Sequence, residues 1–143
     1  MADGAHKFAI SLTTPDGAVF DDEAEMVIVP GAAGEIGVLA RHAPLIALLK
    51  AGSTRVYTDG DAEEIREFAT GPGFFTVEQD RALALVDDAV DVREIDPDEA
   101  QRQLDEARAE LEQVERGESE ADRWQLEQRI KHAENQLAAS GRA

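Results

Sequence analysis

The sequence of 143 residues contains no cysteine, and acidic residues greatly outnumber basic ones. Without cysteine the chain forms neither a disulfide nor a thiolate metal site. Its 14 Lys and Arg stand against 31 Asp and Glu, which gives a formal net charge of −17 at pH 7. Because binding to nucleic-acid phosphates or to anionic lipids needs a basic surface, the composition argues against both and favours a basic protein partner.

Long apolar runs and metal-ligand patterns are also missing. No stretch approaches the roughly 18–20 apolar residues that a membrane-spanning helix needs. The segment Met1–Gly4 has no basic region followed by an apolar one, so we expect no signal peptide and a soluble, cytosolic-type protein. The three histidines, His6, His42 and His132, do not have the spacing of zinc ligands. We therefore expect no metal site, and no arrangement of residues typical of a catalytic nucleophile is visible.

Residues 1–95 have the pattern of a β domain. Apolar Phe8, Ile10 and Leu12 alternate with polar or small residues, which is the period of a strand with one buried face. An Asp-Gly pair at 59–60 separates two further strand-like segments and indicates a hairpin. Many short strands at such spacing predict an antiparallel sandwich or a flattened barrel.

Residues 96–143 have a helical pattern. Asp96 is a good N-cap and Pro97 suits the first helical position, while Ser119 is expected to cap a second helix. In both helices small and apolar residues recur every three or four positions, at Ala100, Leu104, Ala107, Leu111 and Val114 and then at Leu126, Ile130, Ala133 and Leu137. These narrow stripes predict an antiparallel two-helix hairpin.

A glycine-rich segment, Gly31–Gly37, is the most unusual feature of the β domain. It has glycines at every third position and contains Glu35, and His42 follows it. It lacks the Gly-Lys-Ser/Thr of a phosphate loop and runs into a strand pattern, so we interpret the glycines as residues of a turn. His42 either packs or caps locally or contacts a partner. The apolar residues expected to anchor the segment in the sandwich are Val38, Leu39, Leu45 and Ile46.

On the first predicted helix, Asp105 and Arg108 are three residues apart and therefore share a face. From the residues alone, a solvated helix face is the simpler interpretation.

Together these motifs resemble a known family. The segments that carry the resemblance are Gly34-Glu35-Ile36-Gly37, His42-Ala43-Pro44-Leu45, Gly52-x-x-Arg55 and Leu104-Asp105-Glu106-Ala107-Arg108-Ala109. They resemble the epsilon subunit of bacterial and chloroplast F-type ATP synthases, which is equivalent to the mitochondrial delta subunit. The resemblance extends from about Phe8 to Leu137. It implies a ten-stranded flattened β-sandwich in residues 1–95 and a regulatory two-helix hairpin in residues 96–143.

The resemblance also implies a function. An epsilon subunit is a non-catalytic part of the central-stalk rotor, and it lies beside the gamma subunit on the polar loops of the c-ring. It couples proton flow to rotation at the cytoplasmic face of the bacterial inner membrane and requires no cofactor. Its hairpin, when extended toward the alpha and beta subunits, can inhibit ATP hydrolysis. By this resemblance Glu35 and His42 are the expected c-ring contacts.

In some family members the hairpin binds ATP, and here Asp105 and Arg108 occupy the matching motif. Members that bind tightly carry arginines late in the second helix, where this sequence has His132 and Gln136. The resemblance therefore implies that ATP is a weak regulatory ligand. Residues 96–143 hold 13 acids and 7 bases, whereas the family's arm meets an acidic segment of beta. We accordingly predict weak inhibition of hydrolysis.

The alternative interpretation is a free-standing β-sandwich binding module with a coiled-coil oligomerisation tail. Such a module would self-associate through its helical stripes, whereas a rotor subunit would co-purify with gamma. A metal-dependent hydrolase is a third and more distant interpretation, against which the scattered histidines argue.

Overall fold

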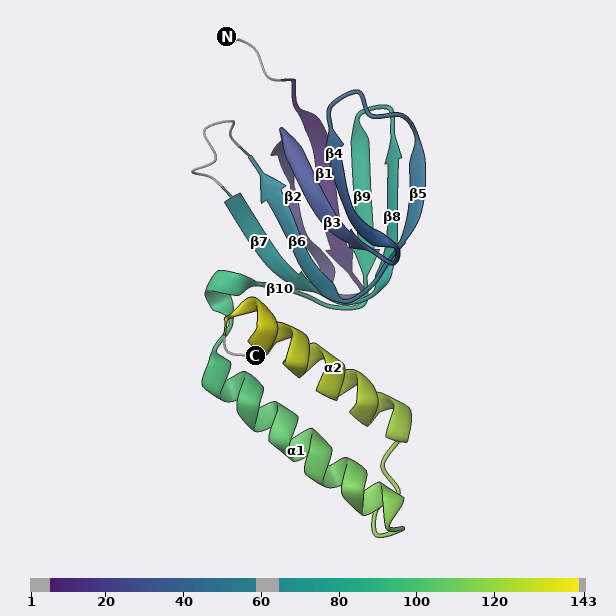
Figure 1. The fold of residues 1–143 in the computed structure, drawn as a ribbon, viewed down its shortest axis with the longest axis vertical. Helices are drawn as coiled ribbons and strands as arrows, with labels where there is room; N and C mark the ends of the chain where they lie inside the picture. Colours follow the sequence, from purple (N-terminus) through teal and green to yellow (C-terminus); the bar gives the residue numbers. More distant parts are fainter. Residues whose placement is uncertain (1–5, 59–64, 142–143) are drawn as a thin grey trace. The chain divides into compact units, whose positions relative to one another are not determined.

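The computed structural model describes residues 6–58 and 65–141, and the hairpin expected at 59–60 lies outside these residues. The chain divides into two compact units, Met1–Asp91 and Val92–Ala143. The first unit holds the strands and the second holds the helices, and Figure 1 shows each of them. Each unit also has a hydrophobic cluster of its own.

The first unit is a sandwich of ten strands in the described part of the chain, which confirms the expected fold. The strands are β1 (Phe8–Thr14), β2 (Gly17–Ala24), β3 (Met26–Gly31), β4 (Gly34–Leu39), β5 (Leu45–Leu49), β6 (Gly52–Tyr57), β7 (Ile65–Thr70), β8 (Gly73–Glu78), β9 (Arg81–Val86) and β10 (Ala89–Asp91). Their order is β10-β7-β6-β3-β5-β8-β9-β1-β2, and β4 pairs with β3 outside this path. The β1–β9 pair is parallel and the other pairs are antiparallel.

The core of the sandwich follows from alternation along the strands. Phe8, Ile10 and Leu12 are buried, as their period of two predicts. The expected anchoring of the glycine-rich segment is correct for Val38 but wrong for Leu39 and Ile46. The side chain of Leu39 is 60% exposed and that of Ile46 is 78% exposed. The reason is the same alternation, because consecutive residues of a strand point to opposite faces of the sheet.

The second unit contains a short 3₁₀ helix, η1 (Val92–Glu94), and two α-helices, α1 (Pro97–Glu115) and α2 (Arg123–Ala139). Asp96 caps α1, and its side chain accepts hydrogen bonds from the backbone N–H groups of Asp98 and Glu99. The expected cap of α2 is wrong. Asp122 caps this helix, whereas the Ser119 hydroxyl accepts a local hydrogen bond from the Ala121 N–H in the preceding loop.

The two helices pack along their predicted stripes. The buried side chains form a small cluster with half-buried Ile130 beside it, and its buried members are Ala100, Leu104, Ala133 and Leu137. Two alanines in this set let the helix backbones approach closely but bury little apolar area. The hairpin therefore has a thin core, and ion pairs line much of its surface.

The backbones of β8 and β9 approach each other closely at Gly73, and a substitution there should lower stability. A Cβ atom added at Gly73 would lie 1.9 Å from the backbone oxygen of Leu85, so β8 and β9 would have to separate locally. We expect Gly73→Ala to lower the free energy of unfolding by about 1–3 kcal/mol in denaturant titrations. The matched control is Gly37→Ala, since a Cβ there meets nothing within 4 Å. Equal stability of the two variants would contradict this account.

Candidate functional site

The glycine-rich segment forms the tight hairpin between β3 and β4. Gly31 and Gly34 face each other across the turn, which leaves two alanines at its tip. Gly34 has φ +140°, a conformation that side chains disfavour, and a Cβ at Gly31 would lie 2.6 Å from the Gly34 oxygen. The glycines therefore permit the turn and the close backbone approach.

Glu35 is the second residue of β4 and lies opposite Pro30 of β3. Its carboxylate accepts a hydrogen bond from Arg55 Nη2 of β6 at 3.0 Å. The two side chains are 62% and 33% exposed, respectively. An ion pair this accessible contributes at most about 1 kcal/mol to the stability of the fold. Glu35 can therefore leave Arg55 and pair with another cation at little cost in free energy.

The loop after β4 carries His42. This side chain is half-buried, and its Nδ1 donates a hydrogen bond to the carbonyl oxygen of the next residue, Ala43, at 2.6 Å. Arg41 has φ +66°, and its N–H donates to Asp80 Oδ1 at 2.5 Å. Asp80 lies in the turn between β8 and β9 and thus holds the loop in a conformation that an Arg rarely adopts.

Glu35 and His42 do not come together. Most of β4 separates them, and the extended part from Glu35 to Leu39 alone spans about 14 Å, at about 3.4 Å per residue. Glu35 lies beside the β3–β4 turn, whereas His42 lies near the β8–β9 turn at the other end of the sandwich (Figure 1). The two expected contact residues therefore belong to separate surfaces.

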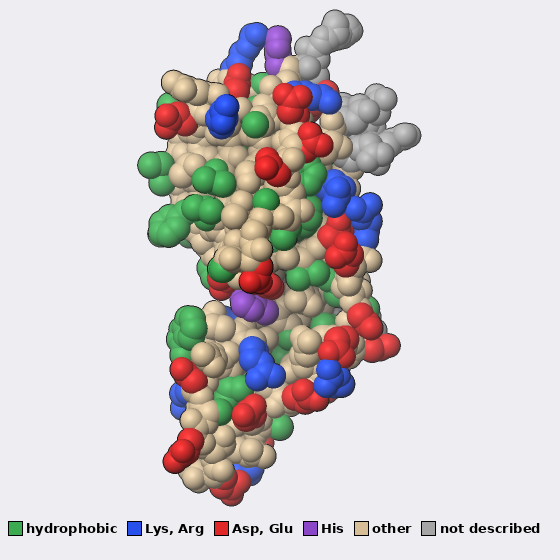
Figure 2. Space-filling view, turned by 180° about the vertical axis from the view of Figure 1, so that it is seen from behind, with side chains coloured by type: hydrophobic (Ala, Val, Ile, Leu, Met, Phe, Trp, Pro, Cys, Tyr) green, Lys and Arg blue, Asp and Glu red, His purple; other side chains and the backbone are tan. Residues whose placement is uncertain are grey.

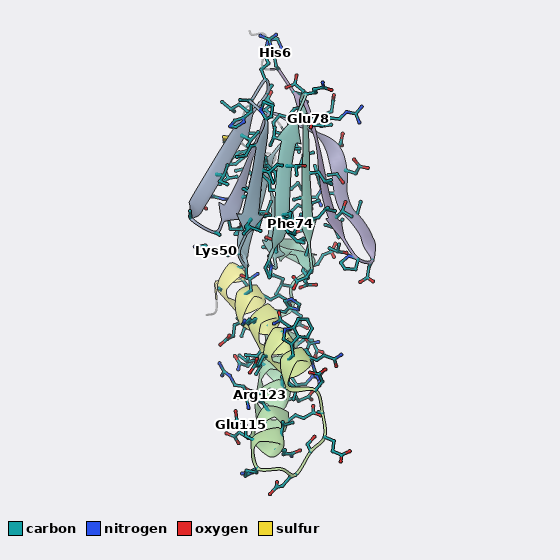
Figure 3. All side chains as sticks on the ribbon, turned by 90° about the vertical axis from the view of Figure 1, so that its right-hand side faces the viewer. His6, Lys50, Phe74, Glu78, Glu115 and Arg123 are labelled. Carbon is teal, nitrogen blue, oxygen red and sulfur yellow. The ribbon has the colours of Figure 1, made fainter. Side chains whose placement is uncertain are left out.

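An exposed apolar face extends over β5, β8 and β9. Cross-strand pairing places Leu48 next to Phe74 and Phe74 next to Leu85, and Ile46 lies two residues before Leu48. All four side chains point away from the core, and that of Phe74 is 55% exposed. Figure 2 shows hydrophobic side chains gathered along one side of the sandwich, and Figure 3 labels Phe74. We call these four residues the β5–β8–β9 face.

Sequence reasoning missed two of these features. The face was missed because residues 45–49 are all apolar, so the sequence does not indicate which alternate residues, Ile46 among them, point away from the core. Arg55 was noted only as part of a motif. Its pairing with Glu35 reaches across β3 between residues 20 apart in the sequence, so no local pattern indicates it.

In the hairpin, the two residues of the ATP-binding motif have separate partners. Asp105 accepts a hydrogen bond from Gln101 Nε2 at 3.0 Å, within α1. Arg108 forms an ion pair with Glu134 of α2 at 2.9 Å. A phosphate would therefore have to displace Glu134 from Arg108.

Most other arginines of the hairpin are paired with carboxylates as well. Arg102 bridges Glu99 and Glu106 on α1, and these hydrogen bonds raise its pKa above the usual range. The hydrogen bond from Arg102 in turn lowers the pKa of Glu99. Further pairs are Arg116–Glu118, Arg123–Glu115, Arg123–Glu127 and Arg129–Glu110. The positive charge of the hairpin is thus largely neutralised within the hairpin itself.

Two further properties concern metals and membranes. Residues 6–58 and 65–141 contain no group of three or more His, Asp or Glu side chains arranged to hold a metal ion. In the same part of the chain, no helix combines the length and the apolar character that crossing a bilayer requires.

Comparison with known proteins gives consistent matches. The family described as "ATP synthase, Delta/Epsilon chain, beta-sandwich domain" matches residues 7–92. The ATP synthase epsilon chain of Gloeothece citriformis is 36% identical over 93% of this chain and 94% of its own length. That of Rubrobacter xylanophilus is 34% identical over 99% of this chain and 97% of its own length.

Solved structures give the same match for the fold. A chain of the mitochondrial ATP synthase of Euglena gracilis (OSCP/F1/c-ring) superposes with a TM-score of 0.71 and 26% identity, over 97% of this chain and 84% of that chain. A chain of the central stalk and c-ring of Tetrahymena thermophila has a TM-score of 0.52 at 13% identity, over 64% of this chain and 72% of that chain, and shows similarity of fold alone.

Proposed function

The chain belongs to the epsilon-chain family of F-type ATP synthases, and on this premise we propose the contacts through which it works. As an epsilon subunit it is a non-catalytic part of the central stalk. We propose that the sandwich binds the gamma subunit and the polar loops of the c-ring, and so couples proton flow to rotation. The complex is membrane-bound, and we propose a peripheral position at the cytoplasmic face of a bacterial inner membrane.

The β5–β8–β9 face is the observation that carries the gamma contact. Four large apolar side chains lie exposed on neighbouring strands, where burial would contribute roughly 25 cal/mol for each Å² removed from water. Contiguous apolar patches on otherwise charged proteins mark protein interaction surfaces. This chain carries a net charge of −17, which disfavours contact between two copies of it. A different subunit therefore fits this face better than a second copy.

We expect Phe74→Asp to weaken binding to gamma from the same source by about tenfold or more, because it places a charge in the centre of an apolar contact. Binding is measured by pull-down and by titration calorimetry with the full chain. The matched control is Val19→Asp, since Val19 is exposed on β2, outside the face. Failure of the unmodified chain to bind gamma would overturn the proposal, and full binding by Phe74→Asp would exclude this face.

Glu35 supports the c-ring contact. Its carboxylate lies on β4 beside an exposed turn, and its pair with Arg55 is accessible enough to exchange for a cation on a ring loop. Such a contact at the rim of an interface sets orientation more than affinity. His42 lies in the loop after β4, at the other end of the sandwich from Glu35. We therefore propose that His42 makes a second c-ring contact, separate from that of Glu35.

Charge reversal tests the role of Glu35. We expect Glu35→Lys to reduce the proton pumping achieved per ATP hydrolysed in reconstituted vesicles by about two- to fivefold, the size of a lost rim contact of up to ~1 kcal/mol. The melting temperature should fall by no more than a few degrees, because the ion pair with Arg55 that this variant removes is exposed. Glu23→Lys, at an exposed site on β2, is the control. Unchanged pumping with Glu35→Lys would refute the contact.

We propose that the hairpin, extended toward alpha and beta, regulates ATP hydrolysis only weakly. Its arginines are occupied by neighbouring carboxylates, so little free positive charge remains to meet an acidic segment of beta. The same pairing supports ATP as a weak regulatory ligand, because Glu134 already occupies Arg108. No other cofactor is needed for this role.

Truncation tests the regulatory proposal. We expect a chain that ends at Asp96 to leave ATP hydrolysis by the reconstituted complex within about twofold of the full chain, a difference of ~0.4 kcal/mol. The steady-state rate is compared at matched occupancy, after binding of the truncated chain to gamma has been verified. Strong activation on truncation would show that the hairpin is a strong inhibitor.

A further inference from the structure

Strand β4 has one unpaired edge. It pairs with β3 along its whole length and with no other strand among the described residues. The next strand, β5, pairs with β8 and meets β3 only where Leu49 faces Gly31. The strands β4 and β5 therefore diverge from the end of β3 and leave the outer side of β4 open.

The backbone groups at this edge follow from one hydrogen bond on the other side of β3. The carbonyl oxygen of Pro30 accepts from the N–H of Lys50 at 2.9 Å, so the backbone of Pro30 faces away from β4. Its partner Glu35 is then in a non-hydrogen-bonded pair, whose N–H and C=O point to the open edge. By alternation the same holds for Gly37 and Leu39. All three residues are exposed.

This edge lacks the usual protection. Exposed edge strands generally carry Lys, Pro or a bulge that prevents another strand from pairing. The register of β3 and β4 is regular through all six pairs. The only charged residue of β4 is Glu35, and its side chain pairs with Arg55 on the face of the sheet. Gly37 has no side chain, and Leu39 is apolar and exposed.

A hollow of about 380 Å³ lies where β4 and β5 diverge. Its walls are the β3–β4 turn, Glu35 and Ile36 of β4, and Ala47 and Leu48 of β5. These walls are mainly apolar, so they suit an apolar side chain. Leu48 also belongs to the β5–β8–β9 face, which makes the hollow continuous with the surface proposed for gamma.

We propose that an extended segment of the gamma subunit pairs with the open edge of β4 as an additional strand and places an apolar side chain in the hollow. Strand addition satisfies the three outward N–H and C=O groups, and the hollow selects one apolar residue. The carboxylate of Glu35 points off the sheet face and stays available to the c-ring. This inference rests on the proposed binding of gamma.

Amide hydrogen exchange of the full chain, with and without gamma, tests the pairing. In the free chain the N–H groups of Glu35, Gly37 and Leu39 should exchange quickly, and those of Ile36 and Val38, which point to β3, slowly. With gamma bound, the three outward amides should slow by about tenfold or more. Exchange on the edge strand β2 should not change. Unchanged exchange of the three amides in a complex that holds gamma would overturn the inference.

Two variants at one position give an independent test. Gly37→Pro removes the outward N–H and leaves the hydrogen bonds to β3, so gamma binding should weaken about tenfold. Gly37→Ala keeps the N–H and meets no neighbour within 4 Å, so binding should be unchanged. If the unmodified chain binds no gamma, the proposed function fails. If all three chains bind gamma equally, or if the edge is protected by self-association without gamma, the inference alone is overturned.

Discussion

The hydrogen bonding of β3 is the constraint on which the functional surface depends. One side of this strand pairs with β4 over its full length, and the other side pairs first with β6 and then, near its end, with β5. Because β6 and β4 lie on either side of β3, Arg55 comes within reach of Glu35. Strand β5 pairs with the end of β3 and then with β8, so it does not pair with the outer edge of β4. The ion pair, the hollow and the open edge thus have one common origin.

The sequence predicts what alternation and capping determine locally. It predicts the buried face of β1, the N-cap Asp96 and the stripes of both helices. It does not determine which of two alternating apolar sets faces the core, so Leu39 and Ile46 were assigned wrongly, and the β5–β8–β9 face was missed. Between Ser119 and Asp122 the residue types are equally good caps, and only the path of the loop decides. The number of strands came from the family resemblance, since periodicity alone left a barrel open.

Contacts distant in sequence could not be predicted at all. Asp80 accepts the N–H of Arg41 from 39 residues away, and this contact holds the loop of His42 in its conformation. Arg55 likewise reaches Glu35 across an intervening strand. Such contacts depend on strand order, which no local pattern contains. The acidic composition, in contrast, was informative for the hairpin, where interleaved acids and bases form ion pairs that occupy most of the arginines.

The geometry of Glu35 would allow one short strand to make both of the proposed contacts. In a strand the side chain is roughly perpendicular to the sheet, whereas the backbone N–H and C=O lie in its plane. The carboxylate of Glu35 is therefore presented on the face, beside Arg55, and its backbone is presented at the edge. Glycines at 34 and 37 add no side chains that would obstruct either approach. A residue with a large side chain at position 37 would narrow access to the face while leaving the edge groups in place, so glycine at this position keeps the face beside Glu35 accessible.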